Sequence, residues 1–206
     1  MLRTLTVAAV LATAAASMPA AAAEFSGFRV EAQGGWNSTG IDYVGPTGVV
    51  VDNSKSSFGY GVEVGYDMPV SETVILGAYG NFAGSTQSYS DMLCPDNATA
   101  CLLGRPNVNA NLGFNWALMA RAGLQVADST LLYGAGGYAQ QNVKYYITPV
   151  GGVTVDTSEN YGGFRFAAGV EQAFGEQFYG KLEYRYSNYQ AGVTTNQITA
   201  GAGFRF

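Results

Sequence analysis

The segment Phe28-Arg-Val-Glu-Ala-Gln-Gly-Gly-Trp36 alternates apolar or small side chains with polar ones along its whole length. Successive side chains of a β-strand point to opposite faces, so a period of two is the pattern of a strand with two different faces. One face of this segment carries Phe28, Val30, Ala32, Gly34 and Trp36, and the other carries Arg29, Glu31, Gln33 and Gly35. The segment therefore predicts an amphipathic strand.

The same alternation recurs along the rest of the chain. Seven further segments show it, at residues 58–68, 74–82, 112–125, 131–147, 164–171, 178–186 and 197–206. The segment 131–147 is predicted to place Val143 on its apolar face and Lys144 on its polar face, and its Gly134–Gly137 stretch is a candidate bulge. Eight amphipathic strands of about ten residues are typical of a transmembrane β-barrel.

The charged residues follow this alternation. All those within the eight segments fall on the face opposite the apolar side chains: Arg29, Glu31, Glu63, Asp67, Arg121, Lys144, Arg165, Glu171, Lys181, Glu183, Arg185 and Arg205. A basic side chain facing lipid at mid-depth costs about 2–4 kcal/mol, so a membrane barrel would place these charges inside. A soluble barrel of the lipocalin type also alternates, but it turns its apolar face inward.

The connections and the aromatic residues favour the membrane barrel over the soluble one. Short connections at 68–73, 127–130 and 173–177 alternate with mostly longer polar regions at 38–57, 83–110, 148–160 and 188–195. Short turns on one rim and long loops on the other are typical of outer-membrane barrels. Aromatic residues near both rims predict two interfacial girdles: Trp36, Phe58, Phe82, Phe114, Trp116, Phe164 and Tyr186 near the long loops, and Phe28, Tyr66, Phe178, Phe204 and Phe206 near the short turns.

The N-terminus predicts export. Residues 1–23 combine a basic start, an apolar core and a small-residue exit, the pattern of a signal peptide cleaved after Ala23. The core from Leu5 to Ala16 is shorter than the roughly 20 residues of a spanning helix, which disfavours an uncleaved anchor. The remaining residues, 24–206, form one predicted barrel domain. Without Arg3 they carry nine basic against fifteen acidic residues, a balance that argues against binding nucleic acid.

The C-terminal segment Gln197-Ile-Thr-Ala-Gly-Ala-Gly-Phe-Arg-Phe206 resembles the signal by which outer-membrane barrels are recognised for assembly. Residues 181–186 and 169–174 resemble strand motifs of small barrels of the OmpA-transmembrane, OmpX and opacity-protein type. The resemblance covers nearly all of residues 24–206. It implies an all-β, eight-stranded antiparallel barrel in the bacterial outer membrane, with short periplasmic turns and longer extracellular loops. It also implies contact with outer-membrane lipid and lipopolysaccharide, and recognition by the barrel assembly machinery through Phe204 and Phe206.

An eight-stranded barrel encloses little more than its own side chains. Buried charges must be paired, so we expect an ion-pair network that fills the lumen. The expected members are Arg29, Glu31, Glu63, Arg121, Arg165, Glu171, Lys181, Glu183 and Arg185. If the lumen were open, the same residues would line a narrow ion pathway, which is the functional alternative.

The sequence offers no evidence for catalysis. The chain contains no histidine, the usual base of barrel hydrolases and acyltransferases, and nothing near a serine or threonine suggests another activator. We therefore predict no enzymatic activity and no cofactor. Cys94 and Cys101 are predicted to form a disulfide, because an exported chain meets an oxidising periplasm and two cysteines without histidine make a poor zinc site.

The function beyond the barrel has three candidates. The first is a structural surface protein that contributes to envelope integrity and displays its loops, with adhesion as a further role. The second is a narrow porin-like channel for small solutes. The third is capture of a surface ligand such as haem by Tyr43 or Tyr89, which has only the aromatic content of the loops in its favour.

Overall fold

The computed structural model describes residues 25–44, 50–86, 88–89, 107–149 and 152–206. The predicted signal peptide, Cys94 and Cys101 lie outside these residues. The strands are β1 (Gly27–Val44), β2 (Val50–Pro69), β3 (Val74–Ser85), β4 (Ser88–Tyr89), β5 (Asn107–Ala127), β6 (Thr130–Thr148), β7 (Val155–Phe174), β8 (Phe178–Tyr189) and β9 (Val193–Arg205). The helical turn η2 (Gln190–Gly192) joins β8 to β9. Within the described ranges, no helix has both the length and the apolar character needed to cross a membrane.

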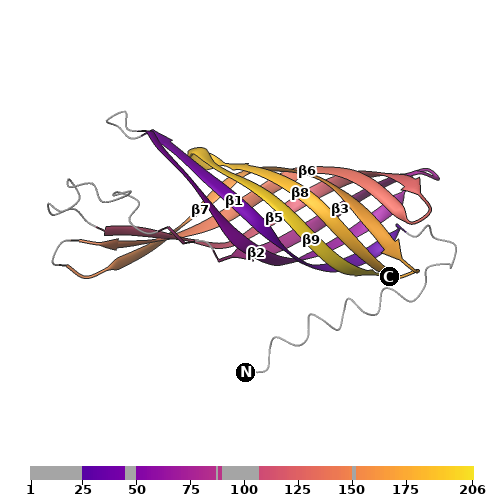
Figure 1. Ribbon diagram of the computed structural model, residues 1–206, viewed down its shortest axis with the longest axis horizontal. Coiled ribbons are helices and arrows are strands. Elements are labelled where there is room, and N and C mark those ends of the chain that lie inside the picture. Colours follow the sequence, from indigo (N-terminus) through magenta and orange to yellow (C-terminus); the bar gives the residue numbers. More distant parts are fainter. Residues whose placement is uncertain (1–24, 45–49, 87, 90–106, 150–151) are drawn as a thin grey trace, which may run out of the picture.

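Eight long strands close into one antiparallel barrel (Figure 1). Each strand pairs with its neighbours in the order β3-β2-β1-β9-β8-β7-β6-β5, and β3 also pairs with β5, which closes the ring. The two-residue strand β4 only adds to the edge of β5. The predicted fold class, an all-β, eight-stranded antiparallel barrel, is confirmed.

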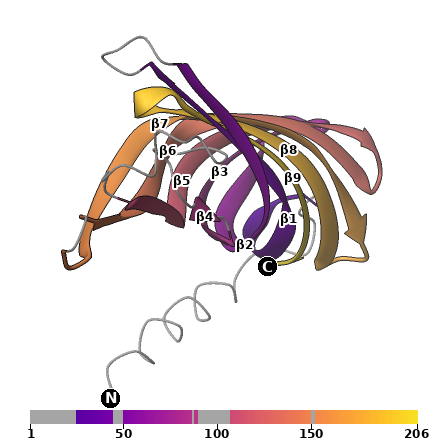
Figure 2. The same cartoon turned by 60° about the vertical axis from the view of Figure 1, so that its left-hand side comes forward.

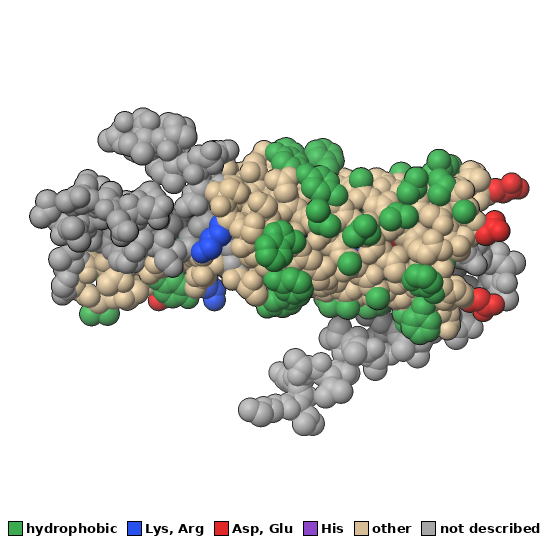
Figure 3. All heavy atoms as spheres, in the orientation of Figure 1, with side chains coloured by type: hydrophobic (Ala, Val, Ile, Leu, Met, Phe, Trp, Pro, Cys, Tyr) green, Lys and Arg blue, Asp and Glu red, His purple; other side chains and the backbone are tan. Residues whose placement is uncertain are grey.

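The two faces of the wall have opposite character. Side chains such as Trp36 and Leu118 point outward and are 60% and 63% exposed, whereas Arg29 on the inner face is 0% exposed. Figure 3 shows hydrophobic side chains scattered over the outside of the wall, with acidic side chains at the end that carries the short turns. The interior is therefore polar and the outside apolar, which is the reverse of a lipocalin-type barrel.

The strands are longer than the sequence predicted, and they lengthen at one end of the barrel. The pairing of β1 with β2 continues to Val44 and Val50, so most of the expected loop 38–57 is strand. The pairing of β6 with β7 likewise continues to Ile147 and Val155. Backbone hydrogen bonds hold a ladder together without apolar side chains, so polar hairpins extend beyond the apolar band. Figure 2 shows both hairpins reaching past the rest of the wall.

The predicted phase of strand β6 is wrong at its far end. Val143 is buried at 6% exposure on the inner face, and Lys144 is exposed on the outer face. The β6–β7 register is unbroken from Thr130 to Ile147, and the odd-numbered residues keep to the inner face as far as Val143. The irregularity expected at Gly134–Gly137 lies instead in β5, where the register shifts by one residue between Leu112 and Asn115. Lys144 is thus the one strand charge of the predicted inner set that faces outward.

Small residues make room for large ones inside the barrel. A methyl group added to Gly203 would collide with the ring of Tyr179 on the neighbouring strand, so the ring fits only because this position has no side chain. At the turn between β7 and β8, Gly175 has a φ of 78°, a left-handed conformation that glycine adopts without strain. These positions fix the packing of the lumen and the tightness of the turn.

A closed barrel should resist detergent until it is heated, because each of the eight long strands has two hydrogen-bonded neighbours. We expect the extracted protein to migrate faster in gel electrophoresis when unheated than after boiling. Co-migration of the two samples would contradict a closed barrel.

Candidate functional site

The lumen is the most strongly structured polar region of the molecule, and it is layered along the barrel axis. At the short-turn end it is sealed by an apolar cluster of Phe25, Ile75, Leu131 and Ala173. Phe25 and Leu131 are both 0% exposed. A layer of charged side chains lies above this seal, and the ring of Phe25 faces the guanidinium of Arg205 at 5.8 Å. Water and ions entering from the other end would therefore meet charges first and an apolar seal below them.

The charged layer contains equal numbers of acids and bases that contact one another. The acids are Glu31, Glu63, Asp67, Glu171 and Glu183, and the bases are Arg29, Arg121, Lys181, Arg185 and Arg205. Their side chains are at most 4% exposed. They come from β1, β2, β5, β7, β8 and β9, so the layer crosses the whole lumen. Balanced charge in direct contact is what makes burial of ten ionised groups tolerable.

Asp67 is the centre of the lower part of this layer. Its carboxylate accepts two hydrogen bonds from Arg121, from Nε and Nη2, each at 2.8 Å. It also accepts one from Arg205 Nη1 at 3.1 Å, and Arg29 Nε lies 3.1 Å from its Oδ2 atom. Arg121 and Arg205 both continue to Glu171, the first through a 2.9 Å bond. Three arginines therefore share the carboxylate of Asp67, and two of them, Arg121 and Arg205, also share that of Glu171.

Glu63 is the corresponding centre of the upper part. It contacts Arg29 at 2.5 Å, Lys181 at 3.2 Å and Arg185 at 3.1 Å. Lys181 also reaches Glu31 at 2.8 Å. Since Arg29 contacts both this group and the lower one, the two parts form one continuous network.

Tyrosines from the inner face complete the layer and bring in the two strands that supply no charge to it. Tyr133 on β6 donates a hydrogen bond to Glu183 at 2.6 Å, and its ring faces Arg121 at 4.9 Å. The ring of Tyr79 on β3 faces Arg29 at 5.0 Å. Such ring–cation contacts stabilise a buried charge without adding another one. All eight long strands thus contribute to one cross-section of the lumen.

Arg165 lies apart from this network although it was predicted to belong to it. Its guanidinium is 1% exposed and donates only to neutral groups: Ser187 Oγ at 2.8 Å, Asn81 Oδ1 at 3.2 Å, Asn115 Oδ1 at 3.1 Å and Tyr189 Oη at 2.9 Å. Within the described ranges, no carboxylate pairs with it. Arg165 therefore joins β3, β5 and β8 to β7 through an amide and hydroxyl layer.

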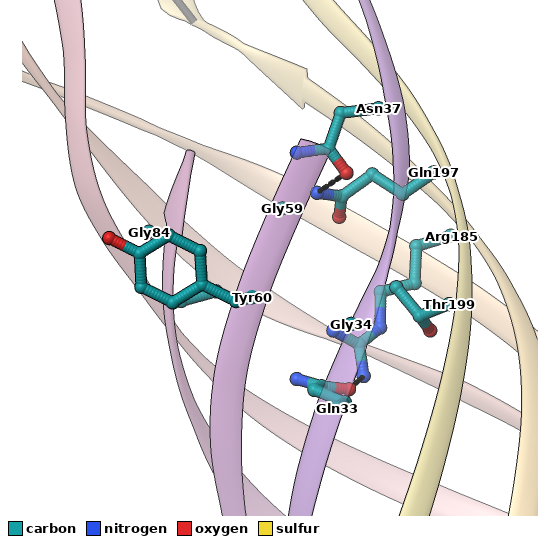
Figure 4. A pocket seen from close by; sticks show the side chains of 10 residues that line it. Gln33, Gly34, Asn37, Gly59, Tyr60, Gly84, Arg185, Gln197 and Thr199 are labelled. Carbon is teal, nitrogen blue, oxygen red and sulfur yellow. Dashed lines mark hydrogen bonds between the residues drawn. The ribbon is translucent and has the colours of Figure 1, made fainter. Parts of the chain in front are cut away.

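A small pocket lies in the inner wall above the charged layer (Figure 4). Its volume of ≈ 10 Å³ is about the space of one water molecule. Asn37 accepts a hydrogen bond from Gln197 at 3.0 Å, and Gln33 accepts one from Arg185 at 2.7 Å. Gln33 Nε2 and Gln197 Oε1 are buried and have no hydrogen-bond partner among the described residues. The pocket is thus suited to bound water.

The nine lumen residues proposed from the sequence all lie buried inside the barrel, and all except Arg165 take part in the ion-pair network. Sequence reasoning placed Asp67 and Arg205 on the correct face but left them out of that network. Both lie near strand ends, where the signal for a lumen position is weaker. Phe204 packs between Phe178 and Phe206, with ring centroids 5.0 and 4.8 Å apart, and its role as an assembly signal stays a prediction.

Comparison with known proteins decides the family. A model of the outer membrane protein β-barrel domain matches residues 7–206. The chain belongs to this family. The 25 kDa outer-membrane immunogenic protein of Brucella ovis is 29% identical over 109 residues, which cover 48% of this chain and 54% of that protein. The chain thus matches about half the length of this curated relative.

Solved structures show the same fold in the family's neighbours. The attachment invasion locus protein Ail of Yersinia pestis, solved with the heparin analogue sucrose octasulfate, has a TM-score of 0.51 and 16% identity, covering 87% of this chain and 99% of that one. Neisserial surface protein A has a TM-score of 0.53 and 14% identity, covering 88% and 98%.

Membership of the outer membrane protein β-barrel domain family places this protein in the bacterial outer membrane, with its apolar wall in lipid. Short turns lie on the periplasmic side of such barrels, so the extended hairpins are extracellular. Within the described ranges, no group of three or more His, Cys, Asp or Glu side chains is arranged to hold a metal ion. The absence of enzymatic activity and of a cofactor stays a prediction.

Replacing Asp67 by Asn should destabilise the barrel by about 3–5 kcal/mol, because it removes the carboxylate shared by three buried arginines. The measurement is the urea dependence of the unheated gel band in detergent. The matched control is Asp128→Asn in an exposed periplasmic turn, which should leave the midpoint nearly unchanged. Equal midpoints for the two variants would contradict a structural role for the network.

Proposed function

We propose that the protein is a non-conducting envelope barrel that displays its long extracellular hairpins as an adhesive surface. The observation that carries this proposal is the contrast between the two ends of the molecule. The lumen is filled by the charged layer and sealed below it, whereas β1–β2 and β6–β7 continue beyond the wall. The barrel therefore closes its lumen to solutes and holds the two extended hairpins outside the membrane.

The lumen offers a poor route for solutes. An ion crossing it would have to displace side chains that are held by several partners each, such as Asp67 and Glu63. Below them it would meet the apolar cluster around Phe25, whose side chains cannot replace its hydration shell. Both barriers support a structural role over a channel.

The β6–β7 hairpin has the composition of a contact surface. Val153 is 85% exposed and Val155 is 61% exposed, although both lie beyond the membrane-facing wall. Exposed apolar side chains among polar ones are a common feature of binding surfaces. The name of the Brucella relative describes an immunogenic outer-membrane protein, which fits a surface that is accessible from outside.

The polyanion bound in the Ail structure is a poor guide to the ligand of this chain. Among the described extracellular residues, Lys55 and Lys144 are the exposed bases, and Asp156 and Glu159 are exposed acids. Such a balanced surface does not attract a sulfated sugar strongly. We therefore favour contacts made by the apolar tip of the hairpin.

A narrow channel is the second candidate. The pocket lined by Gln33 and Gln197 favours it, because buried amide atoms without a protein partner indicate that water reaches this depth. Haem capture lacks comparable support, since the side chains of Tyr43 and Tyr89 lie outside the described part of the chain. It would need a spectral shift on titration with haem.

Conductance separates the first two candidates. We expect the purified protein in planar bilayers to give no reproducible single-channel steps, because the charged layer and the apolar seal both block the lumen. A larger porin reconstituted in the same way serves as the positive control. Reproducible steps from this protein would make the channel the better assignment.

Adhesion tests the displayed surface. Cells that express the chain with Val153→Asp and Val155→Asp should bind cultured epithelial cells less well than cells with the wild-type chain, because charge replaces exposed apolar contacts. The control is Val70→Asp, the same type of substitution at an exposed valine of a periplasmic turn. Equal outer-membrane amounts must first be shown by gel mobility, and equal binding by all three strains would contradict adhesion through this hairpin.

A further inference from the structure

We propose that Arg165 binds one small inorganic anion, of the size of chloride, in the lumen on the extracellular side of the charged layer. The ion would enter from the extracellular mouth of the barrel and stay at this site, so it would cross neither the charged layer nor the apolar seal. The proposal goes beyond the adhesive role of the hairpins and does not rest on it.

The buried charges of the described lumen do not balance. The charged layer pairs five acids with five bases, and Arg165 is a sixth buried base, at 1% exposure. Beyond it on the inner face of β7, the next acid is Glu159, which lies about 20 Å further along the strand and accepts a hydrogen bond from Tyr161. One positive charge is therefore buried with no opposite charge among the described residues, and such burial is costly. An anion from solution would remove this cost.

The groups around Arg165 offer donors rather than acceptors. Four of the five N–H groups of its guanidinium donate to the side-chain oxygens of its neighbours, so one N–H on Nη1 is left. In the described part of the chain, nothing accepts a hydrogen bond from the hydroxyls of Ser187 and Tyr189 or from the amide nitrogen of Asn115. A positive charge surrounded by unused donors has the composition of an anion site.

A bulge in β5 completes this site. The extra residue between Leu112 and Asn115 reverses the side-chain alternation of β5, so Ala110 is buried on one side of it and Asn115 on the other. Phe114, which the first phase would turn into the lumen, is instead 62% exposed on the outer wall. Bulges that re-aim a side chain are over-represented beside functional sites. This one brings an amide, in place of an aromatic ring, to within 3.1 Å of Arg165.

The site selects its ligand by charge and size. One negative charge is enough to neutralise Arg165, whereas a divalent phosphate would leave an excess of negative charge in the same place. Arg165 and Asn115 are 1% and 4% exposed, so only an ion small enough to pass between side chains can reach them. Chloride carries one charge and accepts hydrogen bonds from several directions. Larger ligands are left to the outer surfaces of the barrel.

The first test is the urea midpoint of the unheated gel band, measured on the full chain in uncharged detergent. Sodium chloride is compared with sodium gluconate, whose anion is too bulky for the site, at equal ionic strength. An anion that binds only the folded barrel should lower the unfolding equilibrium constant about tenfold for each tenfold rise in chloride above the Kd. Arg165→Met should lose this dependence. Lys144→Met, which removes an exposed base of the outer face, should keep it.

Asn115→Asp is the sharper variant, because it supplies the missing negative charge from the chain itself, 3.1 Å from the guanidinium. We expect this variant to fold, to have a higher urea midpoint in gluconate than the parent, and to lose the chloride dependence. It also decides the matter if Arg165→Met does not fold.

Direct binding is measured by the line width of the chlorine NMR signal of dissolved chloride. The parent should broaden this line, and Asn115→Asp should not. A parent that leaves the line unbroadened, or that has equal midpoints in chloride and gluconate, would overturn the proposal. Chloride dependence that persists in Asn115→Asp would indicate a general salt effect and overturn it as well. None of these results bears on conductance or on cell adhesion.

Discussion

The burial of ten ionised side chains in a lumen with no room for bulk water is the constraint on which the rest of the structure depends. Most ion pairs of the network join different strands: Arg29 and Glu31 on one strand are 3.8 Å apart, whereas Arg29 and Glu63 on neighbouring strands are 2.5 Å apart. Glu183 and Arg185 are in direct contact along β8, but each of them also has a partner on another strand. Closure of the barrel and completion of the network are therefore the same event. A strand out of register would leave several charges unpaired at once.

The outer face follows from the same period of two. Once the charges face inward, the intervening residues face lipid, and most of them are apolar. Glycine allows large rings to lie flat on both sides of the wall. The ring of Phe166 covers Gly136 outside, and the ring of Tyr179 occupies the space beside Gly203 inside. Wall and lumen thus constrain each other through positions that have no side chain.

Because the lumen is filled, surfaces that bind other molecules are expected on the outside of the barrel. With an apolar seal at one end and a continuous network above it, little of the interior is free to change, so interactions with other molecules fall to the outside. There the wall passes from aromatic rings such as Trp116 to amides such as Asn142, and then to the exposed valines of the β6–β7 hairpin. The composition of the wall thus changes along the barrel axis as its surroundings change from lipid to headgroups to water.

The sequence by itself determined the fold class and the inner set of charges except Lys144, because alternation is a local property that each strand carries independently. It could not reveal that β6 keeps one phase up to Lys144, since this depends on its unbroken pairing with β7 and on a shift in β5. It also missed that Arg165 is bonded to four neutral groups and, among the described residues, is paired with no acid, and that Asp67 joins three arginines. Partners of buried charges come from strands far apart in the chain, and only the closed barrel brings them together.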